Sequence, residues 1–166
     1  MTGSVRESPT SEVTILPAHP PEYAAVKALI NQGLIQRWGT YDTSFNPDLG
    51  HFSNFYQSKQ AVVLVAKLAS PIVGCGMLMK DPEIVGRIVR MTVCEDRQRS
   101  GIGRKILDAL LAAAQSAGYR EVLLETTLTW QSAVAFYTAC GFAPVKTENG
   151  DQHFRRVIDS LERQPP

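Results

Sequence analysis

The residues best suited to chemistry form one short segment, Arg97-Gln98-Arg99-Ser100-Gly101-Ile102-Gly103-Arg104, between an apolar run and an amphipathic one. Its two glycines let a ligand come close to the main chain. The first N–H groups of a helix have no partner inside it, and the helix dipole makes that end partly positive. The segment therefore predicts a pyrophosphate site. The alternative is a glycine-rich helix start that binds nothing.

Two common phosphate-binding motifs do not match this segment. A P-loop requires Gly-Lys-Ser/Thr, but Gly103 is followed by Arg104, Lys105 and Ile106. A Rossmann fingerprint requires a third small residue where Ile106 stands, and the preceding strand is not the first of a βαβ unit. Neither class of nucleotide site accounts for the segment.

Apolar periodicity indicates the elements that position this segment. Helical spacing is present from Pro21 to about Trp38, around Phe52, from Ile102 to Gly118, and from Ala133 to Gly141. Strands are predicted at 13–16, 61–68, 72–79, 84–93 and 121–126, with two more about the Asn149-Gly150 turn, and a loop is predicted at 39–49. The three strands between 61 and 93 have connections too short for a parallel crossover, so we expect antiparallel neighbours. The pattern is typical of one α+β or mixed α/β domain.

Composition limits the classes of function. The 166 residues are 44% hydrophobic and 20% charged, which suits a single domain, expected at 13–160, with tails at 1–12 and 161–166. With 17 Lys and Arg against 16 Asp and Glu, the net charge of +1 argues against nucleic acid or membrane surfaces as partners. The three cysteines lack disulfide or zinc spacing, so a reducing cytoplasm and no metal are expected.

Two motifs resemble the GNAT superfamily of N-acetyltransferases. Gln98-Arg99-Ser100-Gly101-Ile102-Gly103 matches its acetyl-CoA motif, Gln/Arg-x-x-Gly-x-Gly/Ala, in full. The run from Ala133 to Phe142 is similar to its A-x-x-F/L-Y-x-x-x-G-F helix, and Met91-Thr92-Val93 to the end of its fourth strand. The resemblance covers roughly Ala61 to Phe142 and includes the order of elements.

The resemblance implies the GNAT acyl-CoA N-acyltransferase fold, a splayed, mostly antiparallel mixed sheet with helices on both faces. Acetyl-CoA would lie in the gap between the fourth and fifth strands. The main chain of Met91, Thr92 and Val93 would pair with its pantetheine arm, with the Thr92 side chain pointing elsewhere. The pyrophosphate would be held by the main chain of Arg99, Ser100, Gly101, Ile102, Gly103 and Arg104.

Two residues are candidates for proton transfer. Tyr137 matches the tyrosine that in this family protonates the departing thiolate, and a phenol near a cofactor sulfur is chemically able to do so. The alternative is a core aromatic one turn after Ala133. Glu125 closes an apolar strand where some family members carry a general base. The alternative is a strand-end carboxylate that reaches solvent.

The acceptor side departs from the family pattern. Many members have an asparagine at the start of the tyrosine-bearing helix, where this chain has Trp130. An aromatic set falls where the family forms its acceptor pocket, although packing of the first two helices is the alternative. The set comprises Trp38, Tyr41, Phe45, Phe52, Phe55 and Tyr56.

The activity implied by the resemblance is transfer of an acetyl group from acetyl-CoA to a primary amine. The acceptor would be a small molecule or a protein, and the amine would attack directly in a ternary complex. The alternatives are a non-catalytic acyl-CoA-binding sensor on the same fold, an enzyme for longer acyl groups, and a dimerising structural domain. A homodimer is left open.

Overall fold

The computed structural model describes residues 12–40, 42–82 and 84–158. The tails expected at 1–12 and 161–166 lie outside these ranges except for Glu12. One mixed sheet forms the centre, in the order β1-β2-β3-β4-β5-β7-β6. Its strands are β1 (Val13–Pro17), β2 (Val62–Leu68), β3 (Ile72–Asp81), β4 (Val85–Val93), β5 (Glu121–Thr127), β6 (Ala143–Glu148) and β7 (Asp151–Val157).

Neighbouring strands are antiparallel except for β4 and β5, which are parallel. The expected antiparallel order of the three strands between 61 and 93 is confirmed, as are the two strands about the Asn149-Gly150 turn. Both residues of that turn have positive φ, 51° and 82°, which suits a tight hairpin.

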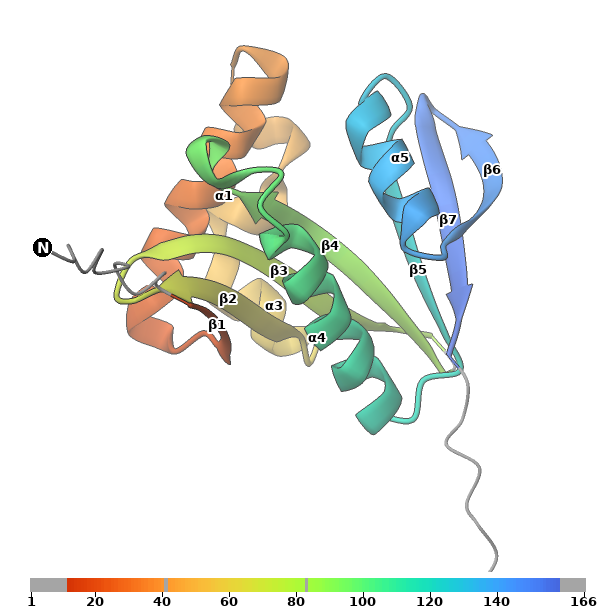
Figure 1. The fold of residues 1–166 in the computed structure, drawn as a ribbon, viewed down its shortest axis with the longest axis horizontal. Helices are drawn as coiled ribbons and strands as arrows, with labels where there is room; N and C mark the ends of the chain where they lie inside the picture. Colours follow the sequence, from red (N-terminus) through yellow and green to blue (C-terminus); the bar gives the residue numbers. More distant parts are fainter. Residues whose placement is uncertain (1–11, 41, 83, 159–166) are drawn as a thin grey trace, which may run out of the picture.

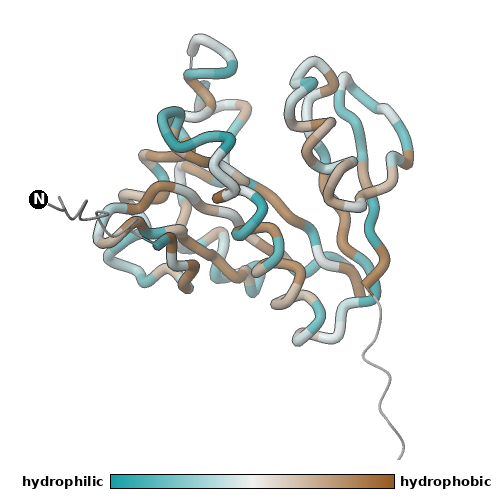
Figure 2. Tube along the Cα trace, in the orientation of Figure 1, coloured by the Kyte–Doolittle hydropathy of each residue, from teal (hydrophilic) through white to brown (hydrophobic). Residues whose placement is uncertain are grey.

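Helices cover both faces of the sheet (Figure 1). On one face lie α1 (Tyr23–Trp38) and α3 (Phe52–Ser58), and on the other lie α4 (Ile102–Ser116) and α5 (Gln131–Ala139). Each face has its own apolar core, and Figure 2 shows the hydrophobic strands between these helices. The mostly antiparallel mixed sheet with helices on both faces confirms the expected fold class.

The segment predicted as a loop at 39–49 contains two short helices, which corrects that prediction. They are the 3-10 helix η2 (Thr43–Phe45) and α2 (Pro47–Gly50). Asp42 accepts hydrogen bonds from the main-chain N and the Oγ of Ser44, at 2.8 and 2.6 Å, and Pro47 stands at the first helical position, which suits its fixed φ. Such local contacts have no apolar period, so the pattern gave no sign of them.

The sheet parts between β4 and β5. The two strands pair only at Val85↔Glu121, Gly86↔Val122 and Arg87↔Leu123, and then diverge (Figure 1). Within the described residues, the edge of β4 from Ile88 to Val93 that faces β5 has no strand partner. The unpaired edge therefore leaves main-chain hydrogen-bonding groups available in the interior of the molecule.

A β-bulge interrupts β4 on its other edge, where it pairs with β3. Pairing with β3 passes from Met77↔Val89 to Cys75↔Thr92, so Arg90 and Met91 together oppose the single residue Gly76. Arg90 has a φ of 56°, in the left-handed region that non-glycine residues seldom adopt. The bulge reverses the alternation of side chains, so that Arg90 reaches the α1 and α3 side while Met91 packs beside α4.

Candidate functional site

The first part of the site is the loop that joins β4 to α4. The 3-10 helix η3 (Glu95–Arg97) follows β4, and α4 then begins after Gly101. Arg99 and Gly101 both have left-handed main chains, with φ of 60° and 85°. Left-handed residues on either side of Ser100, which has a negative φ, turn successive main-chain N–H groups toward one side. Such a turn forms an anion-binding concavity. Gln98 ties the loop to the strand, since its Nε2 donates to the Val93 carbonyl at 3.1 Å.

A cavity of about 350 Å³, which we call the α4 cavity, lies against this loop. Seven of the nine predicted cofactor-binding residues line it, namely Met91, Thr92, Val93, Arg99, Gly101, Gly103 and Arg104. Ile102 instead enters the core, and the Ser100 hydroxyl donates to the Arg97 carbonyl. Ile102 therefore has only main-chain groups to offer to a ligand, and the main-chain N–H is the remaining donor of Ser100.

The side chain of Thr92 packs against α1. A Cβ built on Gly33 of α1 would lie 2.8 Å from the Cγ2 of Thr92, which is closer than real Cβ contacts. Glycine at position 33 therefore allows α1 to lie directly against β4. The contact fixes the helix that forms one wall of the site.

A second cavity of about 430 Å³, the α1 cavity, opens on the other face of the sheet. The two cavities share residues of α1, β4 and α5, so they meet across the gap between β4 and β5. Phe55 and Tyr56 of the predicted aromatic set line the α1 cavity. Phe52 belongs to the core and Phe45 is 83% exposed, so both fall outside the cavity wall, while Tyr41 lies outside the described residues.

Tyr137 lines both cavities and also packs in the core. Its ring contacts those of Phe136, Phe142 and Phe154 at centroid distances of 5.1, 5.9 and 6.1 Å. Burial raises the pKa of Tyr137 to about 12, while the positive charge of Arg37 acts in the opposite direction. The phenol therefore keeps its proton throughout the neutral range. Its position is compatible with both interpretations made from the sequence.

Glu125 lines the α1 cavity but is already engaged in an ion pair. Its Oε2 lies 2.5 Å from Nη1 of Arg87, and Arg87 also pairs with Asp81 at 2.8 Å. The Glu125 side chain is 39% exposed. It stands two residues before the end of β5, which extends to Thr127. The pair joins Arg87, the last residue of β4 that pairs with β5, to a residue of β5 two positions beyond Leu123. Glu125 therefore has a structural contact as well as a place in the cavity.

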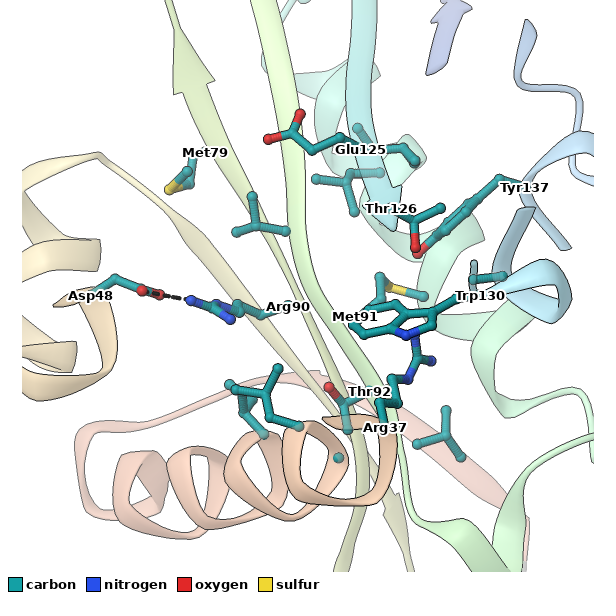
Figure 3. A pocket seen from close by; sticks show the side chains of 18 of the residues that line it. Arg37, Asp48, Met79, Arg90, Met91, Thr92, Glu125, Thr126, Trp130 and Tyr137 are labelled. Atoms are coloured by element: carbon teal, nitrogen blue, oxygen red, sulfur yellow. Dashed lines mark hydrogen bonds and ion pairs between the residues drawn. The ribbon is translucent and has the colours of Figure 1, made fainter. Parts of the chain in front are cut away.

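Trp130 occupies the N-cap of α5 and bridges the gap to α1. Its ring lies 5.2 Å from that of Trp38, and the Arg37 guanidinium carbon is 4.3 Å from the Trp130 ring centroid (Figure 3). Cation–π contacts of this kind stabilise a guanidinium that is partly removed from water. Burial of the group lowers the pKa of Arg37. Trp38 thus contributes to a bridge over the site rather than to the wall of the α1 cavity.

The α1 cavity also contains a polar network that the sequence did not predict. Asp48 and Arg90, which are distant in the chain, face each other there (Figure 3). An arginine inside the apolar strand Ile88-Val89-Arg90-Met91 is the signal that something must pair with it, because an unpaired charge is costly to bury. That signal does not identify the partner.

Two features are absent from the described residues. No three His, Cys, Asp or Glu side chains within 12–40, 42–82 and 84–158 come together in a group that could hold a metal ion. None of the helices in those ranges is long and apolar enough to cross a membrane.

Comparison with known proteins agrees with this geometry. A profile of the acetyltransferase (GNAT) family matches residues 29–142. IAA acetyltransferase of Azospirillum brasilense is 36% identical over 81 residues, which make up 48% of this chain and 53% of that protein. A GNAT-family acetyltransferase of Staphylococcus aureus has the same fold, with a TM-score of 0.79 and 18% identity over 89% of this chain and 100% of that chain. The PaiA N-acetyltransferase of Thermoplasma acidophilum, solved with coenzyme A, has a TM-score of 0.76 and 14% identity over 88% and 99% of the two chains.

The sheet parts between β4 and β5, beside the helix α4 that begins after Gly101. This arrangement is the fold of the acetyltransferase structures. With the profile match covering more than half of its residues, the chain belongs to the acetyltransferase (GNAT) family. It spans about half the length of the curated relatives it matches, from 44% to 53% of each.

Proposed function

We propose that this protein is an N-acetyltransferase that moves the acetyl group of acetyl-CoA to a primary amine. The observation that carries the proposal is the unpaired edge of β4 beside the α4 start, with Tyr137 facing both cavities. Membership of the GNAT family and the coenzyme A bound by the T. acidophilum relative support it.

The α4 cavity fits the pyrophosphate of acetyl-CoA. A Cβ at Gly101 would find no heavy atom within 4 Å, so the space beside the loop is open. The left-handed positions at Arg99 and Gly101 favour an anion, and the helix dipole and arginine side chains add positive charge. We assign the pyrophosphate to the main chain of residues 99–104.

The free edge of β4 fits the pantetheine arm, because an extended chain with amide groups can add to a sheet edge as a strand does. Met91, Thr92 and Val93 would provide the main-chain partners. Since the Thr92 side chain packs on Gly33, its contribution would come from the main chain alone.

Three groups of the chain would take part in the reaction: the main-chain N–H groups of β4, Tyr137 and Glu125. Acetyl-CoA supplies an acetyl group activated as a thioester. Main-chain N–H groups on the β4 edge would stabilise the charge that develops on the carbonyl oxygen. Tyr137, which stays protonated, would give its proton to the departing sulfur, and Glu125 is the candidate to accept the proton of the amine.

The α1 cavity would hold the acceptor. Its volume of about 430 Å³ lies within the usual range for sites that take small molecules. Its wall combines apolar and aromatic side chains with polar and charged ones, among them Gln36, Arg37 and Glu125. A small amine is therefore the acceptor to test first, and a protein N-terminus or lysine second. A reducing cytoplasm is the proposed location, and the free thiols of Cys75, Cys94 and Cys140 are compatible with it.

The proposal is tested by measuring CoA release over a panel of amines that includes amino acids, polyamines and lysine-containing peptides. We expect release that depends on the amine, together with a product that has gained an acetyl group by mass spectrometry. Binding of acetyl-CoA with no release from any amine would favour an acyl-CoA sensor. Failure to bind acetyl-CoA at all would leave the glycine motif without a ligand.

A further inference from the structure

Arg90, at the bulge of β4, is anchored by a carboxylate on the opposite wall of the α1 cavity. Its Nη2 donates to Oδ1 of Asp48 at 2.6 Å, and its Nε donates to Oδ2 at 3.0 Å. The same carboxylate accepts a hydrogen bond of 2.5 Å from the Tyr56 hydroxyl, and Nη1 of Arg90 donates to Oδ1 of Asn46 at 3.0 Å. We call Asp48, Tyr56 and Arg90 the bulge clamp.

The clamp is charged and largely shielded from water. The side chains of Arg90 and Asp48 are 20% and 12% exposed. Burial alone would raise the pKa of Asp48, but the hydrogen bonds from Arg90 and Tyr56 outweigh burial and lower it. Burial likewise opposes the charge of Arg90, while Asp48 raises the pKa of that group. Asp48 is therefore ionised throughout the neutral range.

Stability alone gives no reason for this arrangement. A left-handed main chain is unfavourable for a non-glycine residue, and glycine would avoid that cost. The desolvation of two charges also offsets much of what a buried ion pair gains. The chain nevertheless has arginine at the one position of β4 with positive φ, and uses three of its nitrogens in hydrogen bonds.

The bulge sets the direction of the residues that follow it. It brings Arg90 to the α1 and α3 side, so that Met91 and Val93 pack toward α4 and Thr92 packs on Gly33. The edge from Met91 to Val93 is the part of β4 assigned to acetyl-CoA. The hydrogen bonds of the clamp hold Arg90, the residue immediately before that edge. Asp48 and Tyr56 also line the α1 cavity.

On the basis of the proposed function, we propose that Asp48 and Arg90 are positioning residues for acetyl transfer. Their two-point contact fixes the bulge, and the bulge fixes the β4 edge against which the acetyl group must be presented. The clamp acts through the main chain, with no contact to the reacting atoms required. The competing explanation is that the clamp only anchors α2 and α3 to the sheet, in which case its loss lowers stability and leaves the turnover of folded protein intact.

The test compares Asp48→Asn and Arg90→Lys with the control Glu121→Gln. Glu121 belongs to another charged contact of the sheet, 2.5 Å from Nε of Arg155, at the start of β5. With an active amine, we expect the clamp variants to lower kcat by about tenfold to a hundredfold, the loss typical of a small misplacement of reacting groups. The Kd of acetyl-CoA should stay within about threefold of wild type, because its phosphates are held elsewhere. The control should keep its kcat.

A second measurement needs no turnover and keeps the two proposals separable. Hydrogen exchange of the amides from Arg90 to Val93, followed by mass spectrometry, should be faster in Asp48→Asn than in wild type and unchanged in Glu121→Gln. Arg90→Gly, which removes both the strain and the anchor, should exchange as fast as Asp48→Asn. If the wild type turns over no amine, the proposed function fails while the exchange still tests the clamp. Unchanged exchange, or an unchanged kcat in an active enzyme, overturns the positioning role.

Discussion

At the scale of single residues, Tyr137 combines packing and chemistry in one side chain. Replacement by phenylalanine removes the hydroxyl and keeps the ring contacts with Phe136, Phe142 and Phe154. We expect Tyr137→Phe to lower kcat by roughly a hundredfold, as the loss of a general acid does, with the Kd of acetyl-CoA nearly unchanged. Steady-state kinetics and calorimetry on the same preparation test this. A kcat within about threefold of wild type would leave Tyr137 with a packing role only.

The pH dependence of turnover tests the same residue in the wild type. An exposed tyrosine loses its proton near pH 10, and with it any ability to act as an acid. Burial raises the pKa of Tyr137 to about 12, so the protonated form persists through the alkaline range. We therefore expect kcat to show no fall between about pH 8 and 10.5. A descending limb centred near pH 10 would contradict a buried phenol as the acid.

The carboxylate of Glu125 both lines the cavity and pairs with Arg87. An amine with a pKa of about 10.4 is neutral in only about one molecule in a thousand near pH 7.4, which costs roughly 4 kcal/mol. A base would matter most there. If Glu125 is the base, Glu125→Gln should lower kcat/KM most near neutrality and recover toward wild type near pH 9.5. A ratio to wild type that stays flat from about pH 6.5 to 9.5 assigns Glu125 to the ion pair alone.

At the scale of elements, the contact between α1 and β4 is set by a single glycine. Gly33→Ala would place a Cβ 2.8 Å from the Thr92 Cγ2. Overpacking typically costs about 1–3 kcal/mol, which exceeds the gain of about 1 kcal/mol from replacing glycine in a helix. We expect Gly33→Ala to lower the free energy of unfolding, measured in urea. In a Thr92→Ala background the clash disappears, so the same substitution should stabilise the protein. A loss of equal size in both backgrounds would show that the contact does not set the cost.

Most of the elements follow from apolar periodicity, and the exceptions have a common reason. The four strands from 61 to 126 and the helices α1, α4 and α5 lie where the pattern predicted them. The short helices η2 and α2 were missed, because Asp42 and Pro47 fix them through local contacts without a hydrophobic period. The bulge was also missed. It depends on Arg90 meeting a carboxylate on another element, and pattern reasoning does not reach across such a distance in the chain.

At the scale of the whole molecule, two arms meet at the site. One carries β1 to β4 with α1, α3 and α4, and the other carries β5, β7 and β6 with α5 (Figure 1). The short pairing of β4 with β5 and the Arg87–Glu125 ion pair join the arms at one end. The tilted rings of Trp38 and Trp130 contact each other across the gap. The glycine motif predicted one wall of this gap. The tryptophan bridge was not predictable, since its rings belong to different arms.

The central claim is that acetyl-CoA binds in this gap with its pyrophosphate at the start of α4. The matched variants Gly103→Ala and Gly103→Asp test it, because a Cβ at position 103 would meet the Phe136 ring at 3.6 Å, an ordinary contact. Both variants should therefore fold, and only the second puts a negative charge beside the phosphates. Calorimetric titration should show acetyl-CoA binding by the wild type and Gly103→Ala and none by Gly103→Asp. Binding by Gly103→Asp with the affinity of the wild type would contradict the account.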